Sequence, residues 1–312
     1  MSVTAELKSF GHAFSFHSGL SSVIARHQGC GRILMYHGVA PDGAPALEAQ
    51  LRYLARHFKV VSLEAMVDRL TDRSFPLTNE IVLTFDDGLR NNLTVVYPIL
   101  RELQMPATFF VCPALVESGT WLWNHEVRCR LQKLAASELA EVRMKLLAPD
   151  SSIDGIVEWM KTLRLPQRRQ AEATIRQASA DFRPAASQRA AFDMMDWDDL
   201  LSLDRDLVTV GSHTLSHPIL TGLNSQEIEL EILESRQCLE QRLQRMVDFF
   251  CYPNGAYDQR AHQLVQKTYR AAVTTESGVV DGRGELDLHR LPRIPSAKNA
   301  ALTAWRLHRP EA

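Results

Sequence analysis

The sequence contains few cysteines, and their spacing forms no recognisable pair. Five occur in 312 residues, without a C-x-x-C motif. An odd number of scattered thiols fits reduced, packed side chains better than a disulfide framework. We therefore expect the fold to be stabilised by its core, without disulfides.

The sequence also lacks a strong net charge and any long apolar run. Thirty-five Lys plus Arg stand against 37 Asp plus Glu, a formal net charge of -2, so no global field recruits nucleic acid. No window approaches the roughly 18 uninterrupted apolar residues of a membrane span. Residues 1–32 contain no apolar signal region either. We expect a cytoplasmic protein without a nucleic-acid partner.

One N-terminal segment, Phe16–Arg26, has the spacing of a short amphipathic helix. Packing on the body of the protein is the commoner outcome for such a helix, and we favour it. Peripheral contact with a membrane surface is the alternative.

The chain is long enough to bury one large core. It is 45% hydrophobic and 23% charged, as ordinary globular proteins are. A barrel of about 200 to 250 residues with an insertion fits this length. We expect a single domain over residues 1–312.

Short apolar runs rich in β-branched residues alternate with helix patterns, which indicates α/β architecture. The predicted strands are Arg32–Tyr36, Lys59–Leu63, Ile81–Phe85, Ala107–Val111, Val208–Gly211, Phe249–Tyr252 and Ala271–Thr274. The predicted helices are Ala46–His57, Leu63–Leu70, Asn91–Leu103 and Asn224–Leu243, the last with an Asn224/Glu227 capping box.

The alternation stops between about residues 119 and 190, where sequence rich in Arg, Gln and Ala replaces the strands. We predict a helical insertion into a loop of the barrel. Its charged residues are most simply a solvated surface, and a lid over the active site is the alternative.

Two predicted strands end in residues suited to metal chemistry. IVLTFDDG ends in the adjacent carboxylates Asp86 and Asp87, and LVTVGSHTLSHP carries His213 and His217. An Asp-Gly pair after a strand is often only a turn, but two histidines with three residues between them can bind one metal ion. A carboxylate and two imidazoles give the three protein ligands of a hydrolytic zinc site, with one position left for water.

The motifs TFDDG and HTxxHP resemble those of the polysaccharide deacetylases of the NodB homology class, also called carbohydrate esterase family four. The resemblance covers roughly residues 32–296 apart from the insertion. It implies a deformed (β/α) barrel, a bound divalent metal ion, most simply Zn²⁺, and an N-acetylated sugar or glycan as substrate.

Carried over residue by residue, the resemblance makes Asp86 the general base and makes Asp87, His213 and His217 metal ligands. Chemistry agrees with this division, because a metal lowers the pKa of bound water to about 7 and a carboxylate that is not a ligand can take the proton. At the end of a strand, a turn can aim adjacent carboxylates separately.

A third motif, FFCYPNG, departs from the family pattern. Cys251 stands where the family has an arginine, and Asn254 stands in place of a tyrosine. The backbone N–H of Asn254 remains a candidate for the oxyanion, since any non-proline residue can provide it. Arg293 is our candidate to orient Asp86 in place of the missing arginine. Tyr252 either lines the pocket or lies in the core.

The departing amine also needs a proton from a general acid. The sequence lacks the C-terminal Leu-x-His motif in which many family members place this histidine. His37, directly after the first predicted strand, resembles the N-terminal Tyr-His motif of exopolysaccharide deacetylases, in which the motif order looks circularly permuted. We assign His37 as the general acid, with a structural histidine at the barrel rim as the alternative. In the insertion, Trp121 and Trp123 either stack on sugar rings or pack the insertion.

Three functions remain open. The leading one is a metal-dependent hydrolase that removes N-acetyl groups from an amino sugar in a polysaccharide or glycoconjugate intermediate, with metal-bound water as nucleophile. The second is an allantoinase-like hydrolase of small cyclic amides on the same barrel. The third is a non-catalytic sugar-binding module, against which the complete set of base and ligands argues.

Overall fold

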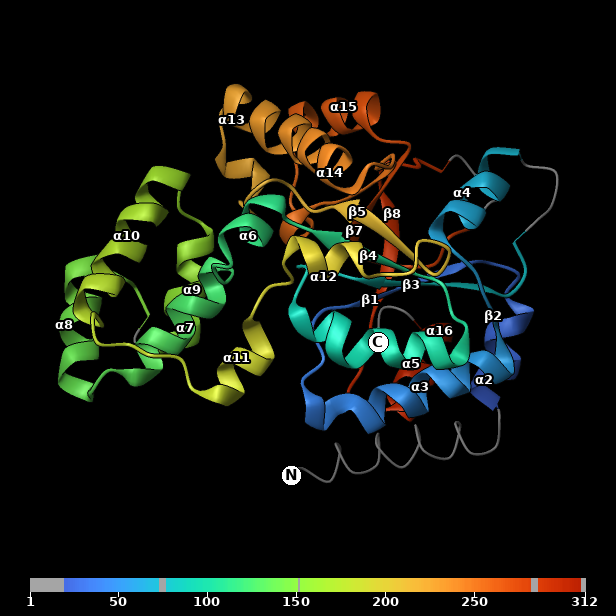
Figure 1. The fold of residues 1–312 in the computed structure, drawn as a ribbon, viewed down its shortest axis with the longest axis horizontal. Helices are drawn as coiled ribbons and strands as arrows, with labels where there is room; N and C mark the ends of the chain where they lie inside the picture. Colours follow the sequence, from blue (N-terminus) through green and yellow to red (C-terminus); the bar gives the residue numbers. More distant parts are fainter. Residues whose placement is uncertain (1–19, 73–76, 151, 282–285, 310–312) are drawn as a thin grey trace.

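The computed structural model describes residues 20–72, 77–150, 152–281 and 286–309 (Figure 1). Its strands form a parallel sheet that closes on itself, because β1 pairs with both β3 and β8. Around the ring lie β1 (Arg32–Tyr36), β3 (Glu80–Phe85), β4 (Ala107–Val111), β5 (Val208–Ser212), β6 (Phe249–Cys251), β7 (Ala271–Ser277) and β8 (Leu291–Pro295). This seven-stranded ring is the deformed (β/α) barrel that the motifs predicted.

Helices surround the ring on its outer side (Figure 1). They are α2 (Leu20–His27), α3 (Ala44–His57), α4 (Leu63–Asp72), α5 (Tyr97–Leu103), α6 (Pro113–Ser118), α12 (Trp197–Leu201), α13 (Ser225–Glu229), α14 (Ser235–Leu243), α15 (Gln259–Thr268) and α16 (Ala300–His308). Asn224 caps α13 and Glu227 bonds back to it, so the predicted capping box is present.

The helical insertion stands to one side of the barrel, in green and yellow at the left of Figure 1. It comprises α7 (Trp123–Lys133), α8 (Ala136–Leu146), α9 (Ile153–Lys161), α10 (Leu165–Ala178) and α11 (Ala186–Phe192). Its inward side chains form an apolar cluster of their own, which includes Val127, Ile156 and Ile175. The segment that returns from the insertion pairs with the loop after β3, because Met194 forms a bridge with Leu89.

Alternate residues of each strand face the barrel interior and the outer helices. One apolar cluster fills the interior and includes Val82 of β3, Phe110 of β4 and Phe249 of β6. Because β4 and β6 are not neighbours in the sheet, these side chains meet across the inside of the ring. Leu83 and Phe109 face outward into the larger cluster beneath the helices. A strand thus delivers one polar side chain to the interior while its neighbour in sequence packs under a helix.

One predicted strand was too long, and one strand was missed. Lys59–Leu63 forms only the two-residue β2 (Lys59–Val60), and Leu63 already starts α4. The strand β8 was not among the predicted runs, because Pro292 and Pro295 argue against a paired strand. In the structure β8 pairs with β7 through an irregular register, which accommodates its prolines.

The N-terminal amphipathic segment is described from Leu20 onward, and residues 16–19 lie outside the described part. The helix α2 packs against α16, which is the arrangement we favoured for this segment. Among the described residues, no helix has the length and apolar character needed to cross a bilayer.

Candidate active site

The predicted site residues meet at one end of the barrel, where the strands finish. Asp86 and Asp87 follow β3, His213 follows β5, and His37 follows β1. All four side chains line one cavity of about 380 Å³. The carboxyl ends of barrel strands converge on one rim, so residues far apart in sequence come together there.

The turn after β3 separates the two adjacent carboxylates. Asp87 has a φ of 77°, in the left-handed region of backbone conformation that residues other than glycine rarely adopt. Gly88 follows with the same φ, and a Cβ there would lie 3.0 Å from Cγ1 of Val111. This backbone turn aims Asp86 into the barrel interior and Asp87 toward the histidines.

Asp87, His213 and His217 surround a common point. Oδ1 of Asp87 lies 3.6 Å from Nε2 of His213 and 3.5 Å from Nε2 of His217. Ligand atoms at about 2.0 to 2.2 Å from a tetrahedral zinc ion lie roughly 3.3 to 3.6 Å from one another. The three side chains therefore fit the donor set and the spacing of a divalent metal site, and their ligand atoms all lie within 4.8 Å of one another.

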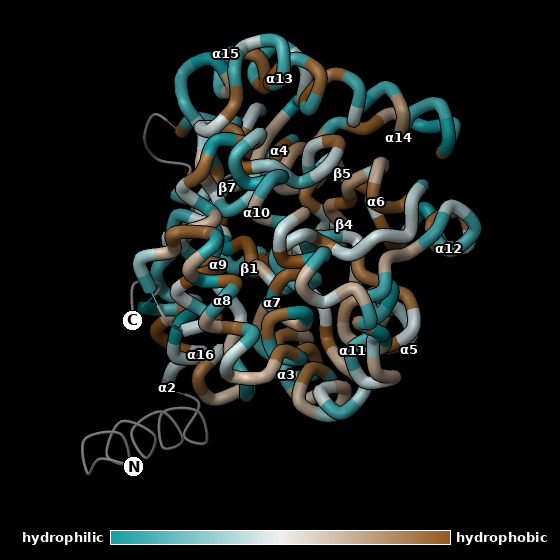
Figure 2. The backbone as a smooth tube through the Cα atoms, turned by 90° about the vertical axis from the view of Figure 1, so that its left-hand side faces the viewer, coloured by the Kyte–Doolittle hydropathy of each residue, from teal (hydrophilic) through white to brown (hydrophobic). Residues whose placement is uncertain are grey.

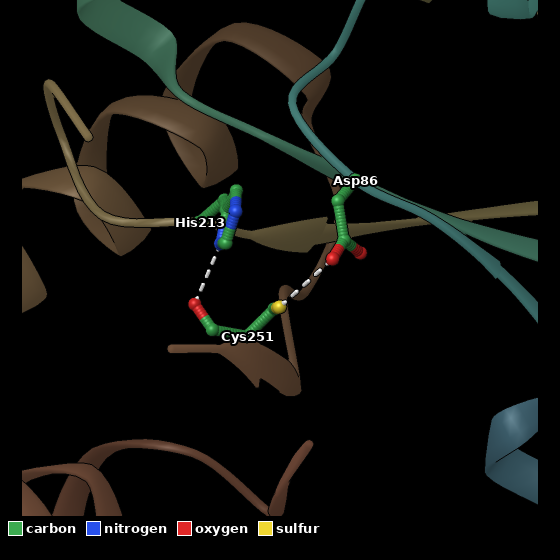
Figure 3. A group of neighbouring side chains, drawn as sticks. All are labelled: Asp86, His213 and Cys251. Carbon is green, nitrogen blue, oxygen red and sulfur yellow. Dashed lines mark hydrogen bonds between the residues drawn. The ribbon is translucent and has the colours of Figure 1, made fainter. Parts of the chain in front are cut away.

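A hydrogen bond sets the tautomer of His213. Nδ1 of this buried ring lies 2.7 Å from the backbone oxygen of Cys251, which can only accept, so Nδ1 carries the proton (Figure 3). In the neutral ring the lone pair is then on Nε2, which faces Asp87. This is the arrangement of a metal-binding histidine that is supported by a backbone carbonyl.

Glu231 fixes the loop between the two histidines. Its carboxylate accepts a hydrogen bond from Oγ of Ser216 at 2.6 Å and another from the backbone N–H of Ser216 at 2.8 Å. Glu231 is buried on the helical segment that follows α13. Sequence reasoning missed this residue, although an acid among the apolar positions of a predicted helix was a signal for it.

Asp86 forms a bidentate ion pair with Arg293 inside the barrel. Nη1 and Nη2 each donate to one carboxylate oxygen at 2.7 Å. Burial opposes the ionisation of Asp86, but the charge and hydrogen bonds of Arg293 outweigh it and hold the pKa of this carboxyl below its usual value. Asp86 is therefore ionised at neutral pH and fixed in orientation.

Arg293 has a partner for each of its five N–H groups. Besides Asp86, it donates to the oxygen of Thr274 at 2.7 Å, to Oγ1 of Thr84 at 3.0 Å and to Sγ of Cys251 at 3.2 Å. Because every N–H group of Arg293 has an acceptor, the charged guanidinium can be fully buried. The thiol of Cys251 also lies 3.6 Å from Asp86, as Figure 3 shows.

The polysaccharide deacetylase family model matches residues 76–272. The chain belongs to this family. The Bacillus subtilis protein YxkH, which carries a provisional name as a polysaccharide deacetylase, is 21% identical over 281 residues, 88% of this chain and 75% of that protein.

Solved structures of deacetylases have the same fold as this family member. The Streptococcus pyogenes deacetylase PplD superposes with a TM-score of 0.60 at 18% identity, covering 89% of this chain and 98% of PplD. IcaB from Ammonifex degensii gives 0.57 at 16% identity, covering 89% and 97%. At such identities the similarity concerns the fold.

The surroundings of Cys251 explain why this family member can lack the arginine of the third motif. Position 251 lies directly against the guanidinium of Arg293. A second guanidinium there would need the same space and would repel the first. The small thiol of Cys251 leaves room for Arg293. Burial raises the pKa of this thiol, so the thiol stays neutral.

Of the two remaining candidates, Tyr252 does not reach the cavity. It follows Cys251, which faces the interior, so it faces outward and is fully buried beneath α15. Its ring packs on Tyr257, with centroids 4.6 Å apart. The pocket-lining interpretation was therefore wrong, and the core interpretation holds. Asn254 does line the cavity, in a tight turn with a φ of 56°.

The insertion supplies residues to the cavity, and of these only Trp123 was a candidate from the sequence. Trp123, Asn124 and His125 from the start of α7 line the cavity, as does Lys161 from the end of α9. The ring of His125 stacks on Phe192 of α11, with centroids 4.4 Å apart. Nothing in the sequence around His125 marks it as a cavity residue.

Proposed function

We propose that this family member is a metal-dependent hydrolase that removes N-acetyl groups from an amino sugar in a polysaccharide or glycoconjugate intermediate. The observation that supports it best is the grouping of Asp87, His213 and His217 beside a separate, ionised carboxylate, Asp86. A binding module would have little use for a buried carboxylate that two hydrogen bonds from Arg293 hold in one orientation.

Each residue has a task in this proposal. A divalent ion held by Asp87, His213 and His217, most simply Zn²⁺, supplies a Lewis acid that activates water at neutral pH. Asp86 accepts a proton from the attacking water, and Arg293 keeps the carboxylate aimed at it. The backbone N–H of Asn254 donates to the oxygen on which negative charge develops.

The general acid in the proposal is His37, which lines the same cavity as Asp86. It protonates the leaving amine, because an unprotonated amide nitrogen is a poor leaving group. Among the solved structures with this fold, that of PplD is described as a complex with acetate. Acetate is the product that N-deacetylation would release.

Acetate release tests the proposal. Purified protein loaded with zinc is expected to release acetate from N-acetylglucosamine oligosaccharides, to stop when a chelator removes the metal, and to resume when zinc returns. Ring opening of allantoin without acetate release would favour the cyclic-amide hydrolase instead. Binding of the oligosaccharides without turnover would favour the sugar-binding module.

The His37→Ala variant tests the general acid. We expect kcat for amide substrates to fall by about 10²- to 10⁴-fold, because the leaving amine loses its proton donor. An aryl acetate, whose phenolate leaves without a proton, should be hydrolysed at nearly the wild-type rate. His27→Ala, an exposed histidine on α2, is the control. Equal losses on amide and ester would assign His37 a structural task.

A further inference from the structure

A second cavity, of about 580 Å³, lies within the insertion beside the candidate active site. Five arginines line it, against three carboxylates: Arg130, Arg168, Arg169, Arg176 and Arg189 against Glu126, Glu172 and Asp193. The chain as a whole carries a formal net charge of -2. This local excess of positive charge is therefore not a property of the surface in general.

Two of the carboxylates are used to hold the arginines in place. Glu126 accepts from Arg130 at 2.8 Å and from Arg176 at 2.7 Å. Glu172 pairs with Arg168 at 3.1 Å, and both of these side chains are buried. The third carboxylate, Asp193, accepts from Nε1 of Trp121 at 2.8 Å. The three carboxylates balance the charges of Arg130, Arg168 and Arg176, so the excess positive charge lies on the other two arginines.

Arg169 of α10 and Arg189 of α11 differ from the other three arginines. Both are exposed, and neither forms an ion pair within 4.0 Å with a residue in the described part of the chain. Their guanidinium groups are available to a ligand in the cavity. Arginine forks match the oxygen atoms of phosphate and carboxylate groups in a bidentate manner.

The second cavity adjoins the candidate active site. Trp123 lines both cavities. Ser216 lines the second cavity, and the next residue, His217, lines the first. Figure 2 looks onto the insertion, with α7, α9 and α10 in front of the barrel strands. One extended ligand can therefore occupy both cavities, with its acetylated sugar next to the metal ligands.

We propose that the second cavity binds an anionic group, a phosphate or a carboxylate, carried by the same glycan whose acetylated sugar occupies the catalytic cavity. This inference rests on the proposed function. It narrows the substrate class to amino sugars joined to an acidic neighbour, such as a sugar phosphate, a diphosphate-linked carrier or a uronic acid. Neutral oligosaccharides would leave the unpaired arginines unused.

The test compares neutral and anionic substrates in the double variant Arg169→Gln, Arg189→Gln. We expect KM for N-acetylglucosamine 1-phosphate, or for an oligosaccharide that alternates with glucuronic acid, to rise about tenfold or more with kcat unchanged. KM for neutral N-acetylglucosamine oligosaccharides should stay the same. Whichever anionic substrate shows the effect identifies phosphate or carboxylate as the source.

The controls are Arg56→Gln on α3 and Lys133→Gln on α7, which remove exposed charges from residues that do not line the cavity. Neither should alter KM for any substrate. An equal rise in KM for neutral and anionic substrates in the double variant would overturn the proposal. The proposal would also be overturned if the wild-type protein hydrolysed both anionic substrates less efficiently than the neutral ones. The arginines would then have no part in recognition.

Calorimetric titration with N-acetylglucosamine 1-phosphate separates this inference from the proposed function. We expect wild-type protein to bind it about tenfold more tightly than the double variant, with the difference shrinking as salt rises. Binding that depends on the arginines, without any acetate release, would support the anion site and refute the deacetylase proposal. Binding that ignores the arginines would refute the anion site alone.

Discussion

Replacement of Asp86 by asparagine is expected to lower kcat for acetate release by about 10²- to 10⁴-fold while the protein keeps its metal ion. The amide oxygen can still accept a hydrogen bond from Arg293, but the side chain can no longer take a proton. Asp86 is held inside the barrel by its bidentate contact with Arg293, and it is not one of the three residues whose ligand atoms surround the proposed metal position. Elemental analysis and steady-state kinetics on the same sample measure both quantities.

The matched variant is His217→Ala. Asp86→Asn should lose activity and keep the metal ion, whereas His217→Ala should lose the metal ion itself. Metal should be lost first, and activity should disappear because of that loss. The comparison can fail, because Asp86, His213 and Cys251 also offer ligand atoms within 4.8 Å of one another. If Asp86→Asn loses metal as readily as His217→Ala, Asp86 is a ligand and the division of tasks between the adjacent carboxylates is wrong.

The sequence predicted the barrel and the group of four central residues because both depend on local patterns. Apolar runs mark the strands, and the polar residues directly after them must lie at the strand ends. Asp86, Asp87, His213 and His217 each follow such a run, so closure of the barrel brings them together whatever the details of packing.

The sequence did not predict which face of a strand each residue takes near the site, or what the insertion covers. The sequence left Tyr252 open between pocket and core because a tyrosine suits either place. The position of His125 depends on how the insertion docks on the rim, which is a matter of tertiary packing. No motif in α7 marks it as a cavity residue.

The sequence predicted Arg293 as a partner of Asp86, although it did not predict the strand β8 that carries Arg293. The ion pair between these two residues is buried. Arg293→Met should destabilise the protein by about 3 to 5 kcal/mol, because it leaves a buried carboxylate uncompensated. It should also lower kcat, since Asp86 loses the contact that fixes its orientation. Urea unfolding and acetate release measure the two effects.

Arg293→Lys distinguishes the charge from the geometry. Lysine keeps the positive charge but cannot replace the five donors that reach Asp86, Thr84, Thr274 and Cys251. We expect it to recover part of the stability and little of the kcat, because one ammonium group cannot hold both carboxylate oxygens.

An exposed ion pair provides the control for this buried one. Arg52 pairs with Glu48 and Glu102 on the surface, and Arg52→Gln should leave the urea-unfolding curve almost unchanged, because exposed ion pairs contribute little to stability. If Arg293→Lys matched wild type in both stability and kcat, charge alone would suffice at this position. The bidentate geometry would then have no part in orienting Asp86, and another residue would have to do so.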